Sequence, residues 1–190
     1  MEQALDNRER VLWGFTLRDV AFAAIIAAAI QVVGFITIPL VGHIPVPGIR
    51  GMVSAPFSAL LLTLATARIR KWPTIGLVYA FNCVVYAFVS PVIPCFVLSS
   101  LVITELFNLI VFRGYSRRIA RLVCVPGFYA VMTPLGTLWG AWILGGQYQR
   151  FIASLPMVGL ATLIVAALAL AGALVGERIV VQLQRAGKMA

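Results

Sequence analysis

Six long hydrophobic runs divide the chain, and short polar or proline-rich connections separate them. Most of these runs approach or exceed the roughly 18–20 residues that a helix needs to cross about 30 Å of hydrocarbon. Their hydrophobicity does not alternate as it does in the strands of a membrane β-barrel. We therefore expect an all-α integral membrane protein with six transmembrane helices, at about residues 17–38, 52–67, 73–90, 92–112, 122–144 and 155–177.

The spans differ in how clearly the sequence marks them. The second run is short and contains Pro56, which favours a broken or tilted helix. The third and fourth runs are separated only by "SPVIP" (90–94), which predicts a tight turn. The first run exceeds the roughly 7–15 residues of a signal-peptide core, so we expect it to be retained. We treat residues 1–190 as one transmembrane domain.

The basic residues indicate the orientation of these spans. Thirteen of the fifteen Lys and Arg residues lie near the two termini or in the connections after the second and fourth runs, and the other two are Arg50 and Arg150. Cytoplasmic connections of membrane proteins carry an excess of Lys and Arg. We therefore expect both termini in the cytoplasm, and the net charge of +9 is mainly a signal of topology.

Composition agrees with the membrane assignment. The chain is 62% apolar and 11% charged, whereas soluble domains have about 45–50% apolar and about 25% charged residues. The mean hydropathy is +1.00. Since no soluble basic face is predicted, we expect no nucleic-acid partner.

Motifs for catalysis or metal binding are missing from the sequence. It contains no G-x-S-x-G, H-E-x-x-H or C-x-x-C pattern. The three cysteines lie in three different hydrophobic runs, and we expect them to be structural thiols. The sequence thus predicts neither an enzyme nor a metal site.

The segment "AFAAIIAAAIQ" (21–31) has six alanines among eleven residues. Ala23 lies one turn before Ala27, and Ala24 one turn before Ala28, so each pair shares a helix face. Small residues let membrane helices approach closely, because lipid offers no hydrophobic drive for association. The spacing alone leaves two possibilities, which are packing within this chain and docking of a separate membrane subunit.

The chain resembles the substrate-binding S components of energy-coupling factor (ECF) transporters, which belong to the ABC type. The resemblance rests on length, six spans, internal termini, the alanine-rich "RDVAFAAIIAAAIQVV" (18–33) and "VITELFNLIVFRGYSRR" (102–118), where an intramembrane Glu precedes a basic exit. It implies capture of a vitamin or related micronutrient at the outer face of a prokaryotic cell membrane.

The resemblance also implies partners, which are a membrane coupling protein (the T component) and two cytoplasmic ABC-type ATPases. These ATPases would use the ATP, and we expect no cofactor on this chain, which contains no G-x-x-x-x-G-K-[ST] loop. The docking surface carried over from the family consists of Ala23 and Ala27, with Ala24 and Ala28 as neighbours.

The connection 39–56 is the first candidate for the ligand site. It is rich in Gly and Pro and contains His43, the only His, and Arg50. In the family, this connection closes the ligand pocket. A planar guanidinium such as that of Arg50 can hold a carboxylate or phosphate, although a surface position in contact with water or lipid headgroups is the alternative for both residues.

Polar residues inside spans are costly and therefore informative. Glu105 lies about two turns from the predicted cytoplasmic end of its span, where it can bind a substrate or tie helices together. Trp139 and Trp142 can stack on a flat ligand or anchor the span at the interface. The remaining ligand-binding candidates are Asn82, Tyr86, Ser100 and Tyr148.

These residues predict a flat organic micronutrient with a polar or ionised group. Glu105 favours a thiamin-like or pyrimidine-like ligand, Arg50 favours an anionic one, and an aromatic site near His43 also fits haem or another tetrapyrrole. The alternative function is a stand-alone secondary transporter or channel. Coupling of transport to ions usually requires several intramembrane ionisable groups, and Glu105 is nearly alone.

Overall fold

A computed structural model describes residues 10–12, 14–41, 49–146 and 154–187. A short antiparallel hairpin of β1 (Arg10–Leu12) and β2 (Phe15–Thr16) precedes the helices. The helices are α2 (Leu17–Val41), α3 (Ile49–Ile69), α4 (Thr74–Val89), α5 (Val92–Val111), α6 (Arg118–Ile143) and α8 (Leu155–Arg185).

Each predicted hydrophobic run is one helix. Five helices of the described chain are long and apolar enough to cross a membrane, and α4 is a shorter apolar helix. The protein is therefore a multi-pass membrane protein. The predicted connection 39–56 is mostly helical, because α2 continues to Val41 and α3 begins at Ile49. The last helix also extends beyond its predicted end to Arg185.

The start of α2 is fixed by reciprocal hydrogen bonds. The Thr16 amide donates to the Asp19 carboxylate at 3.1 Å, and the Asp19 amide donates to the Thr16 hydroxyl at 3.2 Å. This arrangement satisfies two amides near the helix N-terminus. The Lys71 ammonium lies 2.9 Å from Asp19 and donates to the carbonyl of Gly14, so the hairpin is tied to the connection after α3.

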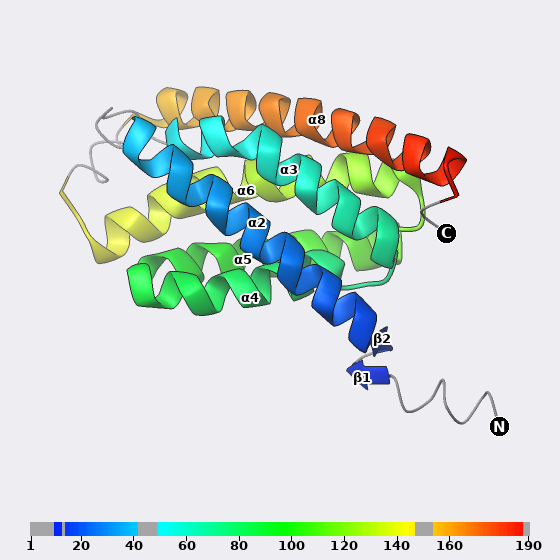
Figure 1. The fold of residues 1–190 in the computed structure, drawn as a ribbon. Helices are drawn as coiled ribbons and strands as arrows, with labels where there is room; N and C mark the ends of the chain where they lie inside the picture. Colours follow the sequence, from blue (N-terminus) through cyan, green and yellow to red (C-terminus); the bar gives the residue numbers. More distant parts are fainter. Residues whose placement is uncertain (1–9, 13, 42–48, 147–153, 188–190) are drawn as a thin grey trace.

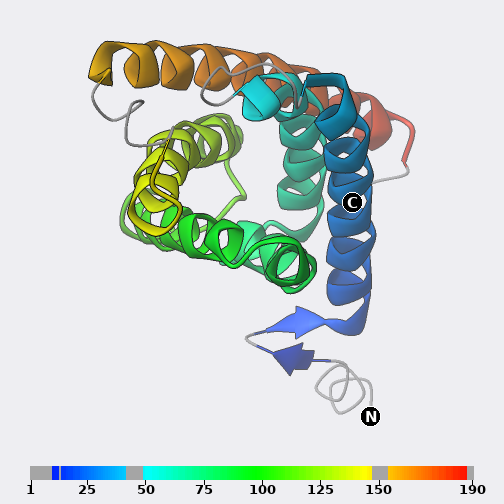
Figure 2. The same cartoon turned by 90° about the vertical axis from the view of Figure 1, so that its left-hand side faces the viewer.

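The helices form a bundle in which α3 is central, because it contacts α2, α4, α6 and α8. Around it, α8 packs on α6, α6 on α5, α5 on α4 and α4 on α2. Figure 2 shows α4, α5 and α6 grouped below α8, with α2 along one side. Both described ends of the chain lie towards the same end of the bundle in Figure 1. We call this the basic end, because it contains Lys71, Arg118 and Arg185.

Helices α3 and α8 approach each other closely at two glycines of α8. A Cβ added at Gly172 would lie 2.0 Å from the carbonyl oxygen of Pro56, and one at Gly176 would lie 3.0 Å from the Cβ of Thr63. Only glycine fits at such a distance from a neighbouring backbone. The small residues that bring these two helices together are thus on α8, and the sequence analysis did not single them out.

The alanines of α2 serve packing within the chain as well. Ala23 is 0% exposed and Ala27 is 3% exposed, because α2 lies against α3 and α4. Their burial agrees with the first possibility left open by the spacing, packing within this chain, and docking of a coupling protein at these two residues stays a prediction. On the side of α2 that faces away from the bundle, Ala28 is exposed and Ala24 is half-buried.

A buried ion pair connects α6 to α8 near the basic end. The Arg121 guanidinium donates from both Nε and Nη2 to the Glu177 carboxylate, and its Nη1 donates to the carbonyl of Tyr115 at 2.8 Å. Glu177 is 2% exposed. A bidentate pair whose remaining donor is also satisfied can offset the cost of removing both charges from water. The pair joins α8 to α6 at the position where the sequence predicted the last helix to end.

The contact at Gly172 can be tested with a pair of alanine substitutions in α8. We expect Gly172→Ala to destabilise the protein by about 1–3 kcal/mol, because its methyl group must displace backbone of α3. Gly159→Ala is the matched control, since a Cβ there meets nothing within 4 Å. The control should leave stability unchanged or raise it by up to about 1 kcal/mol, because alanine favours helix. Thermal unfolding in one detergent measures both, and equal melting temperatures would contradict the close contact.

Candidate functional site

A cavity of about 230 Å³ lies inside the bundle and is lined by residues from α2, α3, α4, α5 and α6. The lining residues fall within the ranges 30–37, 51–58, 79–89, 93–97 and 129–132, although not every residue of these ranges lines the cavity. Most of the lining residues of α2, α3, α4 and α5 lie in the helix halves remote from the basic end, whereas Tyr79 lies near the middle of α4 and the lining residues of α6 lie near its middle. The cavity therefore lies in the half of the molecule opposite the basic end.

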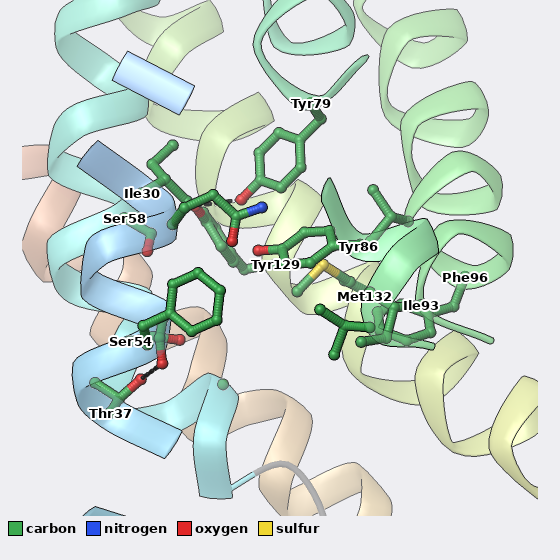
Figure 3. A pocket seen from close by; sticks show the side chains of 16 residues that line it. Ile30, Thr37, Ser54, Ser58, Tyr79, Tyr86, Ile93, Phe96, Tyr129 and Met132 are labelled. Atoms are coloured by element: carbon green, nitrogen blue, oxygen red, sulfur yellow. Dashed lines mark hydrogen bonds between the residues drawn. The ribbon is translucent and has the colours of Figure 1, made fainter. Parts of the chain in front are cut away.

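Hydroxyl groups form the most distinctive part of the lining. The hydroxyls of Tyr79 and Tyr129 are 2.9 Å apart, and both side chains are nearly inaccessible to solvent. Ser58 of α3 lines the same cavity. Figure 3 shows Tyr79, Tyr86 and Tyr129 on one side, with Ser54 and Ser58 from α3 on the other. Three helices thus bring neutral donors and acceptors to one place.

Gln31 adds an amide to this polar side. It is 9% exposed, and its Nε2 donates to the backbone carbonyl of Asn82 at 3.4 Å. This hydrogen bond uses one of the two N–H groups of the amide, so the second N–H and the side-chain carbonyl retain hydrogen-bonding capacity. An amide of this kind offers a donor and an acceptor side by side.

The rest of the lining is apolar and partly aromatic. It includes Phe35, Phe96 and Met132 together with several aliphatic side chains. The Phe96 ring lies against α6, where a Cβ added at Gly136 would be 3.7 Å from the ring. Small-molecule sites typically combine apolar walls with a few convergent polar groups. The cavity has this character, and it is our candidate binding site.

Of the six predicted ligand-binding residues whose side chains the structure describes, Tyr86 is the one that lines the cavity. Asn82 is buried beside it and meets Gln31 through its backbone carbonyl, but its side chain does not line the cavity. Ser100 donates to the carbonyl of Phe96 at 2.6 Å within α5. The ligand-binding predictions for Asn82 and Ser100 therefore do not agree with the cavity.

Glu105 lies towards the basic end, away from the cavity, and it stabilises the start of α4. Its Oε1 accepts a hydrogen bond from the Gly76 amide at 2.9 Å, and its backbone carbonyl accepts one from Trp72 at 3.1 Å. The first amides of a helix have no partner within the helix, and a carboxylate there is favourable. No side chain of α4 itself caps this terminus. Of the two roles left open by the sequence, the structure favours the tie between helices.

The two predicted tryptophans do not reach the cavity either. Trp139 is half-buried and its Nε1 donates to the Ser99 hydroxyl at 3.2 Å, which joins α6 to α5. Trp142 is 79% exposed, and its ring meets that of Trp139 edge to face at a centroid distance of 5.3 Å. Exposure of this kind fits the alternative of an anchor at the membrane interface.

The remaining predicted residues are in or beside parts of the chain that lack a description. His43 and Tyr148 lie outside the described residues. Arg50 is in the first turn of α3, next to Gly51 of the cavity lining, and its side chain is not described. The predictions for these three residues stay predictions.

The sequence contains signals for the cavity lining in the spacing of its polar residues. Tyr79 and Tyr86 are seven residues apart and share a helix face, and Ser54 and Ser58 are four apart in the same way. Gln31 is an uncharged polar residue inside an apolar run. Such pairs mark polar faces, but the sequence does not reveal that the faces meet.

Comparison with protein-family models, with curated proteins and with solved structures gave no match. The geometry of the cavity and the resemblance described above are therefore the basis for a functional assignment.

The role of Glu105 as a cap of α4 can be tested by two substitutions. Glu105→Ala leaves the Gly76 amide without its acceptor, and we expect a loss of about 1–3 kcal/mol in unfolding free energy. Glu105→Gln retains a carbonyl oxygen at the same position and should lose less than half as much. Thermal unfolding of both variants measures the difference. Wild-type stability in Glu105→Ala would contradict the structural role.

Proposed function

We propose that this chain is the substrate-capture subunit of an ECF-type importer and that it binds a vitamin or related micronutrient in the cavity. The observation that carries the proposal is the position of the cavity, which five helices enclose in the half opposite the basic end. A capture subunit requires a site of this kind, deep enough to strip water from a small molecule and close to the face where it arrives.

The orientation follows from the distribution of charge. If α4 is counted as a span, the bundle crosses the membrane six times and both termini lie at the basic end. The positive-inside rule then assigns the basic end to the cytoplasm. In that orientation the cavity belongs to the outer half of the membrane.

The volume of the cavity favours the prediction of a thiamin-like or pyrimidine-like ligand over the prediction of haem or another tetrapyrrole. Its volume of about 230 Å³ falls below the roughly 300–1,000 Å³ of typical drug-sized sites. A pyrimidine-sized ring fits this volume better than a tetrapyrrole does. We therefore favour a small flat micronutrient over haem.

The proposed partners are a membrane coupling protein and two ABC-type ATPases. Because Ala23 and Ala27 are buried within the chain, docking would use the outer face of α2, where Ala28 is exposed and Ala24 is half-buried. Small side chains on that face let a partner helix approach closely.

A stand-alone secondary transporter or channel is the rival function. The described part of the chain contains three acidic residues, namely Asp19, Glu105 and Glu177, and each has a partner that explains its position. None of them lines the cavity. Ion coupling through the cavity thus has less support from this structure than capture and handover.

The proposal can be tested by affinity purification of the tagged chain from its native host, after cross-linking in the intact membrane. Mass spectrometry should recover a membrane coupling protein and two ATPases. In Ala28→Trp the bulky ring obstructs docking at a cost of about 1–3 kcal/mol, so recovery of these partners should fall about tenfold.

Ala167→Trp is the matched control, because Ala167 is exposed on α8, away from the proposed docking face. Its recovery of partners should equal that of the wild type. A wild-type chain that carries no ATPase after cross-linking would contradict the importer and favour the stand-alone carrier.

A further inference from the structure

We propose that the cavity selects an uncharged, flat ring compound and that the hydroxyl pair of Tyr79 and Tyr129, together with the Gln31 amide, is its polar recognition element. This inference rests on the proposed function in one respect, namely that the cavity is the capture site. It narrows the ligand from a micronutrient with a polar or ionised group to a neutral one.

The charges of the described residues point away from the cavity. Among the described residues that line it, every polar side chain is a hydroxyl or an amide. The described acidic side chains are engaged elsewhere, with Asp19 on Lys71, Glu177 on Arg121 and Glu105 on the start of α4. An ionised ligand would lose its hydration in the bundle without an opposite charge to replace it. A neutral ligand avoids this loss.

The hydroxyl pair can serve a neutral polar group in either direction. When one tyrosine donates to the other across 2.9 Å, the accepting hydroxyl keeps its own hydrogen, and both oxygens keep lone pairs. The pair therefore presents a donor and an acceptor from two helices. The side-chain amide of Gln31 adds a second donor and a second acceptor from α2. An amide, a lactam or a ring with adjacent donor and acceptor atoms matches both sets.

The apolar walls favour a flat ring. Phe35, Phe96 and the ring of Tyr86 line the cavity with Met132, and Figure 3 shows Phe96, Tyr86 and Met132 on the same side of the close-up. Aromatic rings prefer offset or edge-to-face contact with other rings, and the Met thioether also makes favourable contacts with aromatic rings. The lining thus combines ring-binding walls with neutral hydrogen-bonding groups.

Three ring compounds of nearly equal shape test the selection by charge. Benzamide is neutral, benzoate is an anion and benzamidine is a cation, and each carries the same benzene ring. We expect benzamide to bind the purified chain at least about tenfold more tightly than either charged compound, as measured by ligand-observed NMR titration at pH 7. Tighter binding of benzoate or benzamidine would overturn the proposal, and so would the failure of all three to bind.

Isosteric variants assign the recognition to named groups. Tyr79→Phe and Tyr129→Phe each remove one hydroxyl and should weaken benzamide binding about three- to tenfold. Tyr115→Phe is the matched control, because Tyr115 is a fully buried tyrosine outside the cavity lining, and it should leave binding unchanged. Melting temperatures without ligand show whether each variant is folded. Equal effects of the cavity and control variants would overturn the assignment.

A variant of Arg50 completes the binding experiment, because Arg50 directly precedes Gly51 of the cavity lining. Loss of benzamide binding in Arg50→Gln would show that a cation is part of the site, and the proposal of a neutral ligand would be wrong. The same conclusion would follow if the wild type preferred benzoate and Arg50→Gln abolished that binding. We expect benzamide affinity to stay within about twofold of the wild type. The importer itself is judged by recovery of its ATPases, so the two ideas can fail separately.

Discussion

Helices α3 and α8 meet at a distance that only glycine permits, with Gly172 facing the carbonyl group of Pro56 and Gly176 facing Thr63. Because α3 also contacts α2, α4 and α6, this contact fixes the helix around which the rest of the bundle is arranged. In lipid, where hiding apolar surface gains little, such close backbone approach is a principal source of helix association. The buried Arg121–Glu177 pair then holds α8 against α6 near the basic end.

The central position of α3 also explains why a polar cavity can exist in the bundle. One face of α3 carries Pro56 and Thr63 against α8, while Ser54 and Ser58 on another face line the cavity. The other hydroxyl groups of the lining come from helices distant in sequence, with Tyr79 on α4 and Tyr129 on α6. Burying neutral hydroxyls in a membrane bundle is tolerable when they bond to one another. The half of the bundle with fewer charges is therefore the half that can hold a ligand.

The type and order of the long apolar helices that the structure describes could be predicted from the sequence, because runs of about 16–25 apolar residues have few alternatives in a membrane. The site was predicted poorly, since the analysis relied on residues that are unusual by themselves. Glu105 and Trp139 are unusual because they join helices. Ala23 and Ala27 are small because α2 packs within the chain. The lining depends on pairs such as Tyr79 and Tyr129, and such pairs follow from tertiary packing.

The central claim is that this cavity holds a small molecule, and native mass spectrometry of the chain purified from its own host tests it most directly. Gly34→Leu is the decisive comparison, because Gly34 lines the cavity and a Cβ there meets nothing within 4 Å. We predict that the wild-type chain carries a bound small molecule and that the filled variant, with an unchanged melting temperature, does not. A bound molecule that is equally abundant in both proteins, or absent from both, would contradict the account.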